Sequence, residues 1–359
     1  MTRKLWFQLG MGALLTLLII KFFIEVKWIF APLAILLKTI FLPLLFGGVL
    51  FYITEPLQRL LEKWKIPRWG SIVIIFALLA GGIWAAVSII GPPIIEQVNV
   101  LIDNTPFIIN EVNNFIPMVV AEAGGLPIWV KDAIENVLDS LNKIALNFGK
   151  WIVQFFQSII QGTLILVLAP FFLLFMLKDH EKFVPFVTQF FTGERKKWVN
   201  KTLNDVDNVL SAYIRGQLLI STILATMLFI GYLIIGLNFA LLLSVFALFM
   251  NVIPFIGPWI AFIPALLIAF FQDPMLLIWV SLVTLIAQQT DANLITPNVM
   301  GKTLDIHPLT IITVLFTAGK IAGFMGILLA IPAYAVGKAI AKNIYERRLD
   351  IKNAANKTI

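Results

Sequence analysis

The sequence predicts an all-α, polytopic membrane protein with about eight transmembrane helices. Hydrophobic residues make up 60% of the 359-residue chain and charged residues only 13%, and the mean hydropathy is +0.93. A soluble domain is nearer half apolar and a quarter charged, because water must wet its surface. Apolar runs of about 20 residues, the length that crosses a bilayer, recur along the chain. Composition and run length therefore agree on the class.

Eight segments meet this length criterion. They lie near 5–24, 33–54, 69–93, 152–177, 216–236, 240–271, 275–292 and 309–340. No small-residue cleavage site follows the first run, so we interpret it as a span that stays in place and not as a signal peptide. The sixth is too long for one straight crossing. It either spans once or forms a re-entrant hairpin, and the sequence leaves both open.

The basic residues predict the orientation. With the N-terminus inside, the cytoplasmic pieces hold two basic residues at 3–4, four at 59–68, seven at 178–215 and six at 338–357, which are 19 of the 27 in the chain. Such a bias is the positive-inside pattern. We therefore expect a multi-pass protein of the cytoplasmic membrane with both termini cytoplasmic and the lipid bilayer as a partner. The net charge of +7 needs no nucleic acid to explain it.

Three regions follow from this topology. Residues 1–93 form an N-terminal three-span segment, 94–150 an extracytoplasmic segment, and 151–359 a C-terminal transport core with a cytoplasmic helix at 194–214. In 94–150 the apolar residues recur at helical spacing, which predicts amphipathic helices. The helix at 194–214 is also amphipathic. It either lies along the inner membrane surface, its lysines near anionic headgroups, or packs against the inner ends of the bundle.

Composition and motifs argue against an enzyme. The chain has no Cys, which excludes disulfides, Fe–S clusters and thiolate chemistry. It has no P-loop, no GxGxxG and no HExxH, and its only histidines are His180 and His307. His180 is most simply a solvated loop residue. We therefore expect no catalytic residues, no cofactor and no metal site.

A backbone break in the sixth segment is the first candidate functional feature. Asn251 is followed by Pro254, Gly257 and Pro258. Two prolines and a glycine within five residues remove helix hydrogen bonds and free backbone carbonyls. Those groups need partners in hydrocarbon, so the break must face protein or water. Transporters hold substrates at such broken helices, although a simple kink or hairpin tip would show the same pattern.

A polar run ends the seventh segment. Gln288, Asp291 and Asn293 are followed by Pro297 and Gly301. Asp291 is the only acid in the last three predicted spans, so it is able to carry a proton or to pair with a cation. The alternative is a helix end exposed at the outer surface, where an aspartate costs little.

Three more residues complete the predicted transport pathway. Lys320 falls about a third of the way into the last span, where an unpaired lysine costs about 2.5–3.5 kcal/mol on insertion scales. It either snorkels to the interface, pairs with Asp291 or lines the pathway. Arg215 and Gln217 lie at the inner start of the fifth span. Arg215 is expected to anchor the helix at the inner membrane surface, and Gln217 is a candidate for lining the inner vestibule of the pathway.

Short motifs in a fixed order carry a family resemblance. They are Ile66-Pro-Arg-Trp69, Pro92-Pro-Ile-Ile-Glu-Gln97, Tyr213-Ile-Arg-Gly-Gln217, Asn251-Val-Ile-Pro-Phe-Ile-Gly-Pro258, Asn293-Leu-Ile-Thr-Pro297, Met300-Gly-Lys302, His307-Pro308 and Ala330-Ile-Pro332. Over most of its length the chain resembles the AI-2E family of autoinducer-2 exporters and related permeases. The resemblance implies an eight-span homo-oligomer that exports small molecules, with some relatives associated with sodium/proton antiport. Many relatives have Glu-Gly-Asn where this chain has Asp291-Ala-Asn293, so the acid is kept but shorter and the glycine is lost.

Three hypotheses about function remain at this point. The leading one is gradient-driven efflux of a small polar metabolite or a signalling molecule of autoinducer-2 type. The second is Na⁺(Li⁺)/H⁺ antiport, with Asp291 as the titrating group. The third is a non-transporting membrane scaffold whose 94–150 helices bind a partner.

Overall fold

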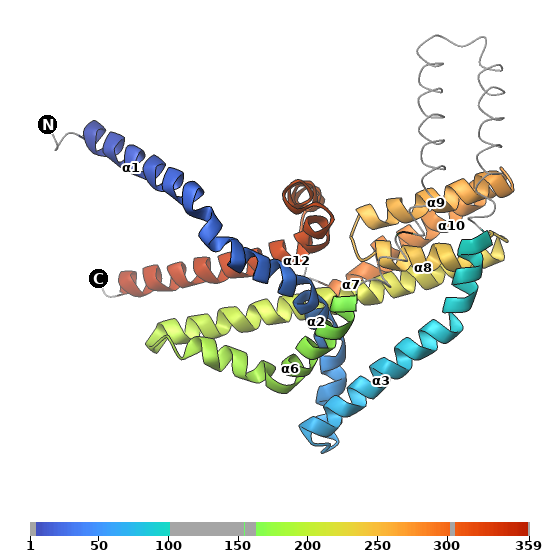
Figure 1. Cartoon of the computed structure of the whole chain (residues 1–359), viewed down its shortest axis with the longest axis horizontal. Helices are drawn as coiled ribbons and strands as arrows, with labels where there is room; N and C mark the ends of the chain where they lie inside the picture. Colours follow the sequence, from blue (N-terminus) through green and yellow to red (C-terminus); the bar gives the residue numbers. More distant parts are fainter. Residues whose placement is uncertain (1–4, 101–153, 155–162, 302–305, 358–359) are drawn as a thin grey trace, which may run out of the picture. The chain divides into compact units, whose positions relative to one another are not determined.

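The described part of the chain is built from helices and contains no β-strand (Figure 1). The computed structural model describes residues 5–100, 154, 163–301 and 306–357. Its helices are α1 (Leu5–Val26), α2 (Ala31–Lys63), α3 (Arg68–Ile89), α6 (Thr163–Thr188), α7 (Gly193–Ile234), α8 (Ala240–Met250), α9 (Ile256–Gln272), α10 (Leu276–Thr290), α11 (Thr296–Met300) and α12 (Pro308–Lys357). A 3₁₀ turn, η1 (Lys27–Phe30), joins α1 to α2, and a π-helical turn, η3 (Asp291–Ile295), joins α10 to α11. The all-α class is confirmed.

Five helices among the described residues are long and apolar enough to cross a membrane. They are Gln8–Val26, Trp28–Lys63, Arg68–Val100, Gly193–Ile234 and Pro308–Leu349. The shorter apolar helices α8 and α9 have 11 and 17 residues, below the roughly 20 that a full crossing needs. The segment 94–150, which is predicted to be extracytoplasmic, and the start of the span predicted at 152–177 lie largely outside the described residues. The count of eight therefore stays a prediction.

The chain divides into two units, which we describe separately. The first comprises Met1–Phe51 and Gly162–Leu177, and the second Tyr52–Gln161 and Lys178–Ile359. In the first unit α2 meets α6 at Gly47, where a Cβ atom would lie 2.7 Å from Cβ of Phe172. Close helix approach at a glycine is typical of packing in membranes. In the second unit the buried core comes mainly from α7, α8, α9 and α10.

Residues 240–271 form a helical hairpin and not a single crossing. The ends of the hairpin meet at Gln272, whose Oε1 accepts a hydrogen bond from the amide of Asn238 at 2.7 Å and whose Nε2 donates to the carbonyl of Gly236 at 2.7 Å. The outgoing arm α8 and the returning arm α9 pack on each other (Figure 1). The amide of Leu242 near the start of α8 donates to Oε1 of Gln97 at 3.0 Å, which satisfies one of the free amides of a helix N-terminus.

The break lies slightly earlier than the sequence predicts. The non-helical residues are 251–255, and α9 already begins at Ile256. Pro258 sits in the first turn of α9, where a proline removes no helical hydrogen bond. Phe255 has φ 65° and ψ −45°, a conformation that only a tightly constrained turn imposes on a bulky residue. The prediction of a break at Pro254–Pro258 is therefore corrected to Asn251–Phe255.

The span predicted at 309–340 is also interrupted. Ala322 and Gly323 leave the helical conformation, and Gly323 has φ 60°. The chain turns so sharply there that a Cβ on Gly326 would lie 1.9 Å from the carbonyl oxygen of Ala318. A continuous helix separates such residues by about 12 Å. The sequence carries no signal of this interruption, because hydropathy does not report a two-residue break.

The amphipathic segment 194–214 is the first half of α7 and not a separate helix. α7 has 42 residues, about 63 Å at 1.5 Å per residue, twice the hydrocarbon thickness of a bilayer. Its first half packs on the end of α12: the Trp198 indole donates to the carbonyl of Asn343 at 3.1 Å, and Lys201 pairs with Glu346 at 2.6 Å. These contacts are the ones expected if the segment packs against neighbouring helices.

Candidate functional site

One turn of α7 brings several elements of the second unit together. In the run Tyr213–Gln217, Arg215 donates to the backbone carbonyl of Tyr52 at 2.6 Å and to Oε2 of Glu55 at 2.5 Å, both on α2. A Cβ on Gly216 would lie 3.1 Å from Cγ of Met300 in α11. Nε2 of Gln217 donates to the carbonyl of Asn251 at 2.6 Å. This turn is therefore the contact point of α2, the hairpin tip and α11.

The hairpin tip carries a buried side chain with unused hydrogen-bonding capacity. Asn251 is 2% exposed, and neither Nδ2 nor Oδ1 of its carboxamide has a hydrogen-bond partner. Its backbone lies against the start of α9, because a Cβ on Gly257 would be 2.9 Å from Cα of Asn251. A buried polar group normally has a partner, since leaving it unpaired costs about 1–3 kcal/mol. An unpartnered carboxamide at a helix break is therefore the arrangement expected of a ligand site.

A second side chain with an unpartnered polar atom lies one turn along α7 from Gln217. Ser221 follows Gln217 by four residues and so shares its face of the helix. It is fully buried, and its hydroxyl has no partner. Gln217, Ser221 and Asn251 are all uncharged, so the polar groups that the structure gathers at the tip are suited to an uncharged polar ligand.

The polar run after α10 is organised locally. The hydroxyl of Thr296 donates to Oδ1 of Asp291 at 2.7 Å, within η3 and α11. Nδ2 of Asn293 donates to the carbonyl and to Oε1 of Gln289. Asn293, Pro297, Gly301 and Lys320 are exposed, whereas Gln288 and Asp291 are half-buried. These contacts stabilise a helix end and do not by themselves assemble a binding site.

Asp291 and Lys320 do not pair. No ion pair joins them among the described residues, which include both. The hypothesis that they compensate each other is therefore not supported by the geometry. Lys320 lies three residues before the conformational break at Gly323.

A family model supplies the classification. The model described as "AI-2E family transporter" matches residues 14–346 of the chain, nearly its full length. The chain belongs to the AI-2E transporter family. The resemblance indicated by the short motifs is thereby confirmed.

Several relatives align with this AI-2E family member over most of its length and most of their own. YueF of Bacillus subtilis (strain 168), named as a candidate transport protein, is 36% identical over 337 residues, 92% of this chain and 91% of YueF. YrrI of the same organism, named in the same way, is 30% identical over 347 residues, 96% of this chain and 97% of YrrI. PerM of Escherichia coli (strain K12), named as a candidate permease, is 29% identical over 308 residues, 83% of this chain and 85% of PerM.

The predicted pathway residues fall into two groups in this AI-2E family member. Gln217, Asn251 and Gly257 meet at the hairpin tip, which contains Pro254 and is followed by Pro258. Arg215 joins the same turn of α7 to α2. The other six predicted residues form no part of that junction in the contacts described above. No group of three or more His, Asp or Glu side chains in the described ranges is placed to hold a metal ion.

Sequence reasoning missed the buried acid beside this junction. Glu55 is 4% exposed and pairs with Arg59 and Arg215, and its Oε1 lies 3.9 Å from Nε2 of His180. His180 is not a solvated loop residue: its Nδ1 lies 3.2 Å from Nη2 of Arg68. The predicted span ended at residue 54, one residue before Glu55. A glutamate at the end of an apolar run, followed four residues later by arginine, was the available signal.

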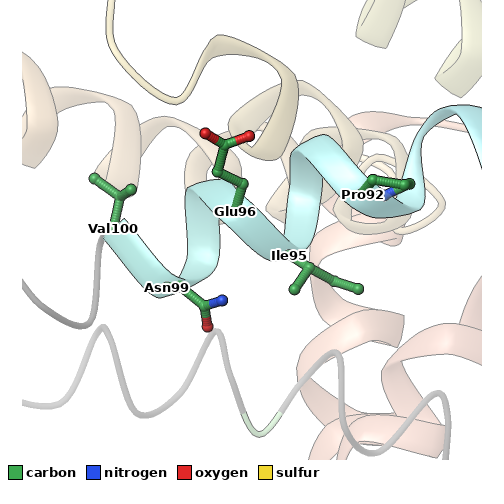
Figure 2. A pocket seen from close by; sticks show the side chains of 5 residues that line it. All are labelled: Pro92, Ile95, Glu96, Asn99 and Val100. Carbon is green, nitrogen blue, oxygen red and sulfur yellow. The ribbon is translucent and has the colours of Figure 1, made fainter.

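A hollow of about 510 Å³ lies elsewhere, along the helical extension of α3. Its lining residues are Pro92, Ile95, Glu96, Asn99 and Val100. Figure 2 shows Glu96 and Asn99 projecting to opposite sides of the helix, so the polar groups of its described lining residues do not converge. Convergent polar groups characterise ligand sites, and we therefore place the candidate site at the hairpin tip.

Proposed function

We propose that this protein is a secondary transporter that carries a small, uncharged, polar solute through a site between the hairpin tip and α7. The observation that carries the proposal is the Asn251 carboxamide, which is buried and unpartnered at a break between two helices. A carboxamide both donates and accepts hydrogen bonds, which matches hydroxyl, carbonyl or amide groups of a solute. Membership of a transporter family supports transport over a scaffold role.

Efflux of a signalling molecule of autoinducer-2 type is the form of this proposal that the family resemblance favours. A gradient would drive it, because the sequence holds no nucleotide-binding motif. We further propose that the protein lies in the cytoplasmic membrane and acts as a homo-oligomer. The apolar stretch Gln8–Val26 of α1 is not buried within the chain. This exposure supports a contact of α1 with lipid or with another subunit.

The Asn251→Ala variant tests the proposed site. In proteoliposomes, labelled autoinducer-2 and a panel of labelled pentoses and polyols are offered to the wild-type protein and the variant. We expect solute flux in the wild type and a loss of at least about tenfold in the variant, the order expected when a buried polar contact worth 1–3 kcal/mol is removed. Asn204→Ala is the matched control, since Asn204 is exposed on α7 and its Nδ2 donates to Oδ1 of Asn200 in the same helix.

The same liposomes distinguish solute transport from Na⁺(Li⁺)/H⁺ antiport. A pH-sensitive dye reports proton movement when Na⁺ or Li⁺ is added. Cation-driven proton flux that Asp291→Asn abolishes, together with no solute flux, would replace our proposal with antiport. Equal solute flux in wild type and Asn251→Ala would show that the site lies elsewhere.

A further inference from the structure

The Tyr213–Gln217 turn of α7 is held from two sides. Arg215 and Gln217 are two residues apart, so their side chains leave the helix about 200° apart. Arg215 binds α2 through Tyr52 and Glu55, while Gln217 binds the carbonyl of Asn251. A shift of this turn relative to α2 would therefore move Gln217 relative to the hairpin tip.

Glu55 is the anchor on the α2 side. Its side chain is 5% exposed, and Arg215 approaches one of its oxygens at 2.5 Å. The guanidinium of Arg215 also reaches the Tyr52 carbonyl, so it forms two directional bonds to one segment of α2. A planar guanidinium is able to make both bonds at once, which a lysine ammonium does with far less geometric precision.

Arg59 also pairs with the Glu55 carboxylate, but it is exposed to water and lies on the same helix. Its side chain is 66% exposed, and it lies four residues after Glu55 on the same helix. Its pair therefore joins α2 only to itself and is screened by water. The pair of Glu55 with Arg215 instead joins two helices and buries one partner, and removing one partner of such a pair is strongly disruptive.

We infer that Glu55 is a positioning residue for the solute site: acting through Arg215, it keeps the Tyr213–Gln217 turn seated on the hairpin tip and so keeps Ser221 and Asn251 shielded from water. The inference rests on the proposed function for the identity of the site. The shielding itself is a property of the protein without any solute.

The absence of cysteine from the chain allows a direct test. Ser221→Cys introduces a thiol at a fully buried position beside the tip. The labelling rate of that thiol by a water-soluble maleimide is measured in the purified, full-length protein in detergent. Ser244→Cys, in the middle of α8 and also buried, serves as a second probe away from the tip.

Adding Glu55→Gln is expected to raise the labelling rate at position 221 at least about tenfold and to leave position 244 unchanged, because only the seating of one turn is released. Adding Arg59→Gln, the matched control, is expected to change neither rate. Arg215→Lys is expected to act as Glu55→Gln does, and it takes the place of that variant if Glu55→Gln yields no folded protein in gel filtration.

Unchanged labelling at position 221 in both Glu55→Gln and Arg215→Lys would overturn the inference. Equal increases at 221 and 244 would also overturn it, since they would show a merely structural loosening. Failure of the proposed function gives a different result: the labelling pattern would hold while the wild-type protein moves no solute in liposomes.

Discussion

At the residue scale, the hairpin tip requires a glycine at position 257, where the two arms come very close. A Cβ on Gly257 would lie 2.0 Å from the carbonyl oxygen of Met250, so the two arms approach each other through bare backbone. Gly257→Ala must push α8 and α9 apart at the tip. We expect it to destabilise the protein by about 1–3 kcal/mol, the usual cost of overpacking, and to reduce solute flux. The melting temperature in detergent and flux in liposomes measure both effects.

Gly81→Ala is the control for this substitution. Gly81 lies inside α3 and nothing approaches within 4 Å of the position of its absent Cβ. Alanine forms helices better than glycine, so its melting temperature should be unchanged or slightly higher. If Gly257→Ala were as stable as Gly81→Ala, the close approach of the two arms would be contradicted.

At the scale of elements, an ion pair links α3 to α6 beyond the apolar run of α6. Arg68 donates to Oε2 of Glu181 at 2.9 Å, and this hydrogen bond holds the pKa of the Glu181 carboxyl below its usual value. A lowered pKa stabilises the fold above the unfolded value of about 4.3, and the contribution is lost as the pH falls through the folded value. Glu181→Gln should therefore lower the melting temperature at neutral pH and match the wild type in acid.

The size of this effect is small. The Glu181 side chain is 64% exposed, so water screens the pair, and less than about 1 kcal/mol is expected. Glu96→Gln, at an exposed position on the extension of α3, is the control and should leave the melting temperature unchanged. A deficit in Glu181→Gln that persisted in acid would mean that the carboxyl acts through packing and not through its charge.

The sequence predicted the helices better than their breaks. Apolar runs predict where helices lie, and Pro254 with Gly257 signals an interruption near the right place. Hydropathy does not distinguish one long crossing from two arms that return, because both bury the same residues. The break at Ala322–Gly323 carries no proline, and the partners of Asp291 and Glu55 depend on contacts that no local pattern specifies.

At the scale of the whole molecule, the hairpin has a defined direction relative to α7. Its base, at Asn238 and Gln272, follows the C-terminal end of α7, while its tip reaches back to Gln217. The segment 216–301 contains no Lys or Arg, whereas four basic residues lie between 195 and 201, at the other end of α7. The positive-inside rule therefore predicts a cytoplasmic α6–α7 turn and an outward-facing hairpin base.

Single cysteines test this topology in intact cells. Arg195→Cys lies at the start of α7, and Asp273→Cys directly follows α9 at the base of the hairpin. A membrane-impermeant maleimide should label Asp273→Cys in intact cells and Arg195→Cys only after the cells are permeabilised. The reverse pattern would mean that the protein has the opposite orientation, so that the hairpin tip enters the membrane from the cytoplasmic side. Labelling of both in intact cells would contradict the crossing of α7, because the mostly apolar part of α7 beyond Arg215, residues 216–234, would no longer separate two aqueous faces.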